Sequence, residues 1–186
     1  GVLGAATVGG TAVGCAPTAT NPPGVFSLGV TAGLHSPTEV VLWTRVDQVN
    51  APGVTSVDWQ VATSPTFSTI VASGSAPVSP LADGCVKVLV GSLDPDTSYW
   101  YRFISGATNS PVGRARTVPA PDATPSSLNL AFCSCQSYAN GYYGAWRDIA
   151  AQDLDFVLFL GDYIYEAPLI QILRPIRSES LDTIDT

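Results

Sequence analysis

The sequence of 186 residues is poor in charge, contains no methionine and has a single histidine. Charged residues make up 12% of the chain against 46% hydrophobic residues, so the composition is that of a globular protein and not of a disordered chain. Only eight residues are basic and the net charge is −7, which excludes nucleic-acid binding by clustered positive charge. An acidic protein can still act on a phosphate ester when bound cations invert the local field.

No hydrophobic run indicates a transmembrane span. Residues 1–16 are small, apolar and uncharged, which is typical of the apolar part of an export signal. Because an initiator methionine and a basic leading region are absent, we expect a partial product in which residues 1–23 are an export-signal remnant or a disordered tail. Cys15 loosely resembles a lipoprotein attachment site, and a chance cysteine stays an equal alternative. The predicted location is secreted, periplasmic or at the cell surface.

The four cysteines do not indicate a disulfide framework. Removal of a signal that contains Cys15 would leave an odd number of three. Cys133 and Cys135 are two residues apart, so on a strand they face the same side without good geometry for a mutual bond. Whether Cys85 pairs stays open.

Short segments with alternating hydrophobicity, separated by glycine and proline, fill the first two thirds of the chain. This spacing is typical of a β-sandwich. The predicted strands cover residues 25–30, 40–44, 57–61, 70–72 (a short edge strand), 86–90, 99–103 and 112–118.

One short motif makes the sandwich prediction more specific. Leu93, Pro95, Thr97 and Tyr99 are spaced two residues apart, which resembles the corner before the sixth strand of fibronectin type III domains. In that corner the tyrosine hydroxyl bonds to the upstream backbone while the ring fills the core. The motif predicts structure and carries no chemistry.

The pattern changes after a proline-rich stretch at residues 119–125, which we predict to be a linker. A short apolar strand at 128–132, a helix at 141–152 and an unbroken apolar strand at 156–160 follow the βαβ order. Beyond Glu166 the hydrophobic residues follow neither a helical nor a strand periodicity. Two strands and one helix cannot bury a core, so we expect residues 126–186 to be an incomplete domain.

Potential ligand residues follow the two strands of this βαβ unit. Asp162 comes after the second strand and after Gly161, which allows a tight turn, and Cys135 follows the first strand. Because neighbouring parallel strands end together, we expect both side chains within reach of one metal ion. A thiolate, a carboxylate and the phenolate of a nearby tyrosine would favour a highly charged cation such as ferric iron. The plainer alternative is that Asp162 only caps a helix or turns a loop.

These motifs together resemble the alkaline phosphatase D (PhoD) family. The resemblance rests on residues 132–138, 141–147 and 153–166, with a weaker likeness at 26–30 and 41–45. It implies a phosphomonoesterase and phosphodiesterase with an iron (Fe³⁺) and calcium centre, exported by twin-arginine machinery. It also implies that Cys135 is the thiolate ligand of the iron, that Asp162 is shared by iron and calcium, and that Tyr165 is the phenolate ligand.

Other residues receive structural roles. Cys133 lies outside the motif and is predicted to be a buried core thiol. Tyr163 is expected to pack under the site and Glu166 to shape its loop. His35 is expected to be a solvated surface residue in a turn, within a loop (residues 33–37) that departs from the Gly-Asp-Pro arrangement of the family. With His35 as the only imidazole, the metal centre cannot be complete in these residues.

The predicted fold is mainly β: a fibronectin type III-like β-sandwich at residues 24–118, followed beyond the linker by the truncated βαβ start of an α/β metallophosphoesterase domain. The predicted function is release of phosphate from small phosphate esters by an exported metal-dependent enzyme, with this fragment inactive alone. A non-catalytic fibronectin-like surface or binding module is the alternative, and the gene sequence beyond Thr186 would discriminate. A relative of the purple acid phosphatases is a third candidate, against which the position of Cys135 argues.

Overall fold

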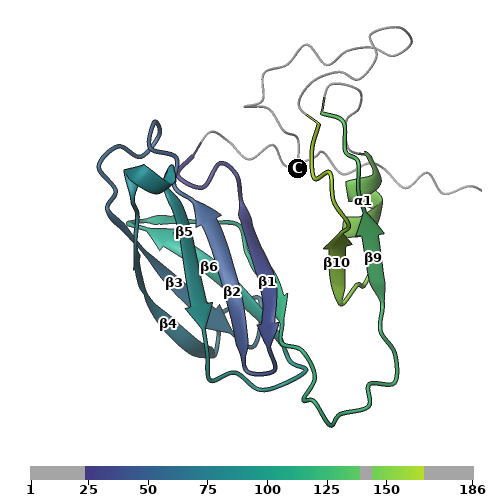
Figure 1. The fold of residues 1–186 in the computed structure, drawn as a ribbon. Coiled ribbons are helices and arrows are strands. Elements are labelled where there is room, and N and C mark those ends of the chain that lie inside the picture. The colour runs from purple at the N-terminus through teal and green to yellow at the C-terminus, as the bar shows by residue number, and fades with distance from the viewer. Residues whose placement is uncertain (1–23, 139–143, 166–186) are drawn as a thin grey trace, which may run out of the picture.

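The computed structural model describes residues 24–138 and 144–165. These residues form an antiparallel β-sandwich, followed by two parallel strands with a short helix beside them (Figure 1). In the part of the chain that the structure describes, no helix has both the length and the apolar character needed to cross a bilayer.

The sandwich consists of two antiparallel sheets. The first has the order β1-β2-β5, with β1 at Val30–Ser36, β2 at Glu39–Arg45 and β5 at Cys85–Val90. The second has the order β4-β3-β6-β7, and β8 also pairs with β6. Its strands are β3 (Ser56–Ala62), β4 (Ile70–Pro77), β6 (Ser98–Ser105), β7 (Thr108–Asn109) and β8 (Gly113–Arg116). A single 3₁₀ turn, η1, spans Pro80–Ala82 between β4 and β5.

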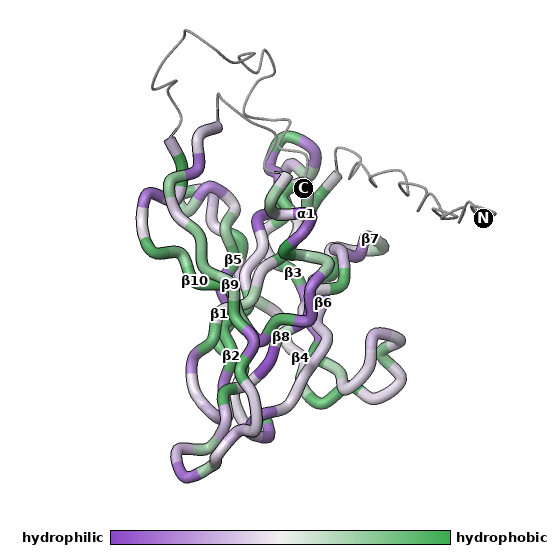
Figure 2. Tube along the Cα trace, turned by 90° about the vertical axis from the view of Figure 1, so that its right-hand side faces the viewer, coloured by the Kyte–Doolittle hydropathy of each residue, from purple (hydrophilic) through white to green (hydrophobic). Residues whose placement is uncertain are grey.

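The core lies between the two sheets because every second residue of the central strands points inward. On β2 the inward residues are Val40, Leu42 and Thr44, and on β6 they are Tyr99, Tyr101 and Phe103; all six are buried. Figure 2 shows the resulting alternation of hydrophobic and hydrophilic positions along the chain. The hydroxyl of the one polar member, Thr44, donates to the carbonyl oxygen of Gly29 at 2.9 Å.

The predicted tyrosine corner is present. The hydroxyl of Tyr99 accepts a hydrogen bond from the backbone N–H of Asp94 at 2.9 Å, and the Tyr99 ring is buried. The hydroxyl of Thr117 closes the same corner by donating to the carbonyl oxygen of Asp94 at 2.6 Å. The mainly β fold with a fibronectin type III-like sandwich is therefore confirmed.

The start of the sandwich differs from its prediction. Residues 25–28 form a turn and not a strand: the backbone N–H of Gly29 donates to the carbonyl of Phe26, and Gly29 has a φ of 68°. Phe26 is 5% exposed and Leu28 46%, so the apparent alternation does not place both on one face. His35 lies within β1 and not in a turn, and β7 was not predicted at all.

The second part of the chain contains β9 (Leu130–Cys133), α1 (Gly144–Ala150) and β10 (Phe156–Phe159). β9 and β10 pair in parallel, with Leu130 opposite Phe156 and Cys133 opposite Phe159, which confirms the βαβ order. The predicted helix at 141–152 lies partly outside the described residues, and α1 ends two residues earlier than predicted. The Trp146 ring of α1 stacks on Phe159 with 5.2 Å between ring centroids.

Two arginines of β8 connect the sandwich to the turn before β10. Arg116 forms ion pairs with Asp155 of this turn and, at 2.7 Å, with Asp96 of the sandwich. Arg114 pairs with Asp153 at 3.2 Å. A small, mostly apolar cleft lined by Leu34, Leu128 and Phe156, among others, lies beside Arg116. The sandwich thus contacts the end of β10 at which the strand begins.

Candidate metal centre

Cys135 and Asp162 follow β9 and β10 at the end of the sheet opposite to the contact with the sandwich. Because the two strands are parallel and in register, the residues after them emerge at one edge. Both have left-handed backbones, with φ of 59° at Cys135 and 48° at Asp162, and Gly161 has a φ of 134°. Such conformations are unfavourable for side-chain-bearing residues and cluster at functional sites. They turn the chain sharply where each potential ligand stands.

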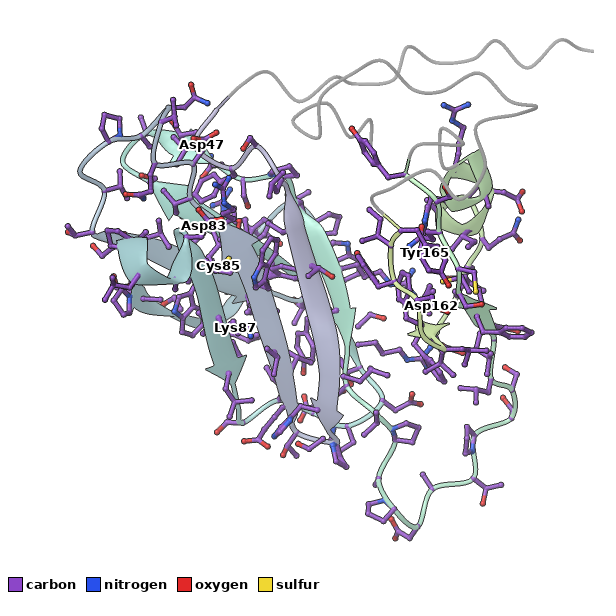
Figure 3. The ribbon with its side chains drawn as sticks, turned by 45° about the horizontal axis from the view of Figure 1, so that its top comes forward. Asp47, Asp83, Cys85, Lys87, Asp162 and Tyr165 are labelled. Carbon is purple, nitrogen blue, oxygen red and sulfur yellow. The ribbon has the colours of Figure 1, made fainter. Side chains whose placement is uncertain are left out.

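The three predicted ligand side chains converge. The Sγ atom of Cys135 lies 3.6 Å from the Oδ2 atom of Asp162 and 3.8 Å from the hydroxyl of Tyr165. Figure 3 shows Asp162 and Tyr165 beside each other at the tips of this small sheet. Among the described residues, no three His, Cys, Asp or Glu side chains are grouped as a metal site would require.

Backbone hydrogen bonds extend the pairing of the strands into the two ligand-bearing loops. The N–H of Tyr165 donates to the carbonyl of Gln136 at 2.6 Å, and the N–H of Tyr138 donates to the carbonyl of Tyr165 at 2.9 Å. These bonds form an isolated parallel bridge between Ser137 and Tyr165. The position of Tyr165 is therefore fixed against the loop that carries the thiol.

The proton of Tyr165 is held within the cluster. A hydrogen bond to the Asp162 carboxylate raises the pKa of the Tyr165 hydroxyl above its usual value; partial burial and the hydrogen bond to Cys135 raise the pKa further. A cation that binds the phenolate oxygen of Tyr165 would have to displace this proton.

The donor set fits a cation. Metal–oxygen and metal–sulfur bonds of about 2.0 and 2.3 Å, at angles between 90° and tetrahedral, place two ligands of one ion roughly 3.0–3.5 Å apart. The observed separations of 3.6 and 3.8 Å exceed this range by a few tenths of an ångström. Small side-chain rotations can close that difference.

The neighbouring residues differ in part from expectation. Cys133 is half-buried and its thiol faces the carbonyl of Leu158 at 3.7 Å, so the prediction of a buried core thiol is wrong. Tyr163 is 63% exposed and its ring lies 4.5 Å from the ring of Phe159. His35 is a surface residue of the sandwich, 3.5 Å from Glu39. Glu166 lies outside the described residues.

Two side chains at the site had no assigned role in the sequence. Gln136 contacts both Trp146 of α1 and the loop after β10. In the sequence, the position of Gln136 directly after Cys135 was the signal that could have indicated a role at the site, since groups next to a metal ligand often orient it.

Comparison with known proteins places these features in a family. Residues 12–119 match the family described as PhoD-like phosphatase, N-terminal domain, and residues 130–181 match PhoD-like phosphatase. Alkaline phosphatase D of Bacillus subtilis (strain 168) is 41% identical over 168 residues, which is 87% of this chain and 28% of that protein. A solved structure described as the structure of PhoD superposes with a TM-score of 0.72 at 41% identity, covering 78% of this chain and 29% of that one.

The chain therefore spans under a third of the length of these relatives. The first family match alone covers more than half of the 186 residues. The second match includes all three converging side chains. On this basis the chain belongs to the PhoD-like phosphatase family.

Proposed function

We propose that the protein to which this chain belongs is an exported, metal-dependent phosphoesterase that releases phosphate from small organic phosphate esters, both monoesters and diesters. The observation that carries the proposal is the convergence of Cys135, Asp162 and Tyr165 at the tips of two parallel strands. The similarity to a protein named alkaline phosphatase D supports it.

The proposed ions are Fe³⁺ and calcium. A thiolate, a carboxylate and a phenolate are all anionic, and such a set stabilises a highly charged ion best. Asp162 would be shared by the iron and the calcium, because calcium prefers oxygen ligands and the carboxylate has two oxygens. When bound, the cations neutralise the developing charge on the phosphoryl oxygens. The chain's own part is to present these donors at an exposed edge that a phosphate ester can reach.

We further propose that residues 24–118 form the sandwich domain, 119–125 a linker and 126–186 the N-terminal part of a metallophosphoesterase domain, with residues 1–23 an export-signal remnant or a disordered tail. Three donors do not fill the coordination of two cations, because calcium alone takes about six to eight oxygens. The only histidine, His35, belongs to the sandwich. We therefore expect residues 1–186 alone to hydrolyse nitrophenyl phosphate esters with negligible turnover.

Export by the twin-arginine route is part of the proposal. Its support is the apolar, uncharged stretch at residues 1–16, which lies outside the described residues. Fractionation of cells that express the whole gene checks it: the protein should appear outside the cytoplasmic membrane and be retained inside when the twin-arginine translocase is inactivated.

The direct test is a titration of residues 1–186 with chelated Fe³⁺ in the presence of Ca²⁺. Thiolate and phenolate ligands should produce a visible charge-transfer absorption that grows to one iron per chain. Cys135→Ser and Tyr165→Phe should each change or abolish the band. Cys133→Ser is the matched control, because this thiol points to a backbone carbonyl and should leave the band unchanged. An iron titration without a band, or a band that survives both ligand substitutions, contradicts the proposal.

A further inference from the structure

The side-chain amide of Gln136 makes two hydrogen bonds to different elements. Its Nε2 atom donates to the carbonyl oxygen of Tyr163, in the loop after β10, at 2.6 Å. Its Oε1 atom accepts from the indole N–H of Trp146 in α1. The residue thus connects the loop after β9 with the loop after β10 and with the helix.

These two partners fix the orientation of the amide. A backbone carbonyl can only accept and an indole N–H can only donate, so the amide nitrogen must face Tyr163 and the amide oxygen must face Trp146. A glutamate at position 136 could accept from the indole, but its carboxylate would repel the carbonyl of Tyr163. A methionine has the same length and provides neither bond.

The elements joined by Gln136 also contact one another. Trp146 stacks on Phe159, the last residue of β10, and the ring of Phe159 lies 4.5 Å from the ring of Tyr163. Together with the two hydrogen bonds of Gln136, these ring contacts close a cycle that joins the helix, the end of β10 and the loop after it. Asp162 stands inside the segment that this cycle encloses, between Phe159 and Tyr163.

The backbone of Gln136 touches both other predicted ligands. Its N–H donates to the carbonyl of Asp162 at 3.3 Å, and its carbonyl accepts from the N–H of Tyr165 at 2.6 Å. Asp162 has a left-handed φ of 48°, a conformation that is uncommon for residues other than glycine. The cycle of contacts that includes Gln136 is placed to hold the segment that contains Asp162.

We propose that Gln136 is a positioning residue of the metal centre. Its amide holds the loop after β10 and helix α1 against the loop after β9, and so sets the spacing of Cys135, Asp162 and Tyr165. Gln136 itself binds neither ion nor substrate in this role. The consequence for metal affinity rests on the proposed function, whereas the effect on the loops does not.

The first arm of the test needs no metal. Amide hydrogen exchange, measured by NMR on residues 1–186, is compared between the wild type and Gln136→Met. The N–H groups of Tyr138 and Tyr165 should exchange about tenfold faster in the variant, while those of β3 stay unchanged. Gln60→Met is the matched control, because the Gln60 amide bonds Arg102 within the sandwich and should leave both loop amides unaffected. Unchanged exchange at Tyr138 and Tyr165 in Gln136→Met overturns the proposal.

The second arm measures the apparent Kd for Fe³⁺ through the charge-transfer band. Gln136→Met should weaken binding about 10- to 100-fold, the usual effect of losing a group that orients a ligand. Trp146→Phe keeps the ring on Phe159 but removes the N–H, so it should cause part of this loss. In the double variant, Trp146→Phe should cause no further loss of affinity for Fe³⁺ beyond that of Gln136→Met, because the indole N–H acts through the Gln136 amide.

The outcomes separate the two proposals. A wild-type chain that binds Fe³⁺ and a Gln136→Met chain that binds it equally well overturn the positioning role. A wild-type chain that does not bind Fe³⁺ refutes the claim that these three donors are enough to hold iron, and the exchange arm alone then decides the role of Gln136. If Gln136→Met and Trp146→Phe lower the affinity for Fe³⁺ independently of each other, the proposed link between Gln136 and Trp146 is also contradicted.

Discussion

At the residue scale, space and backbone conformation decide which side chains the fold accepts. Gly113 of β8 lies opposite Tyr101 of β6, and a Cβ atom on Gly113 would overlap the phenol end of the Tyr101 ring. Tyr101 is 1% exposed, so its ring has no room to withdraw. The opposite case occurs at the candidate site. There Cys135 and Asp162 carry side chains at left-handed backbone positions, a conformation that glycine would adopt more easily.

The first prediction follows from this contact. Gly113→Ala should lower the free energy of unfolding by about 1–3 kcal/mol, because the added methyl group forces the buried ring or the strand to shift. Urea unfolding measures the change. Gly33→Ala in β1 is the control: its Cβ would meet only the Cβ of Val41, at 3.9 Å, so its effect should be small. Equal stability of the two variants would show that the contact does not constrain β8.

At the element scale, the ion pairs of β8 determine how the sandwich meets β10. The carboxylate of Asp155 is 17% exposed; it pairs with Arg116 and accepts from the backbone N–H of Asn129 at 2.8 Å. Asp153, paired with Arg114, is 90% exposed. Exposed ion pairs contribute little to the stability of a fold. Removing the partner of a partly buried, hydrogen-bonded carboxylate lowers the stability more.

We therefore expect the two arginines to differ in effect. Arg116→Ala should speed amide exchange at residues 156–159 by about 10- to 30-fold, because the anchor of the turn before β10 is lost. Arg114→Ala should change the exchange rate at these residues by less than about twofold. Hydrogen exchange on the two variants gives the comparison. A similar response to both substitutions would mean that the sandwich does not anchor β10 through Arg116.

The elements also show how far the sequence alone could lead. Alternation predicted most strands of the sandwich because their inward residues are buried on one face. It failed at residues 25–28, where Phe26 and Leu28 alternate but the N–H of Asp47, distant in sequence, bonds the carbonyl of Val25 and holds a turn. The two-residue strand β7 is too short to carry a period.

The site was predictable to the same degree. Spacing placed Cys135 and Asp162 after adjacent strands, and their proximity follows from the parallel pairing. The roles of Gln136 and Arg116 depend on partners that only the folded chain brings together: Trp146 lies ten residues from Gln136 and Asp155 lies 39 from Arg116. A local pattern does not contain such contacts.

At the scale of the whole molecule, the sandwich and the candidate centre lie at opposite ends of β9 and β10. The sandwich contacts the turn where β10 begins, and the three donors follow the ends of the two strands. The sandwich therefore contacts the β9–β10 sheet at the turn before β10 and supplies none of these three side chains. The central claim is that a sulfur, a carboxylate oxygen and a phenol oxygen bind one iron ion.

X-ray absorption at the iron edge, on residues 1–186 loaded with Fe³⁺, tests this claim most directly because it identifies the bound atoms. We predict one sulfur at about 2.3 Å with oxygen neighbours at about 2.0 Å. The sulfur signal should disappear in Cys135→Ser and persist in Cys133→Ser. An iron surrounded by oxygen and nitrogen alone in the wild-type chain, or a sulfur signal retained in Cys135→Ser, would contradict the account.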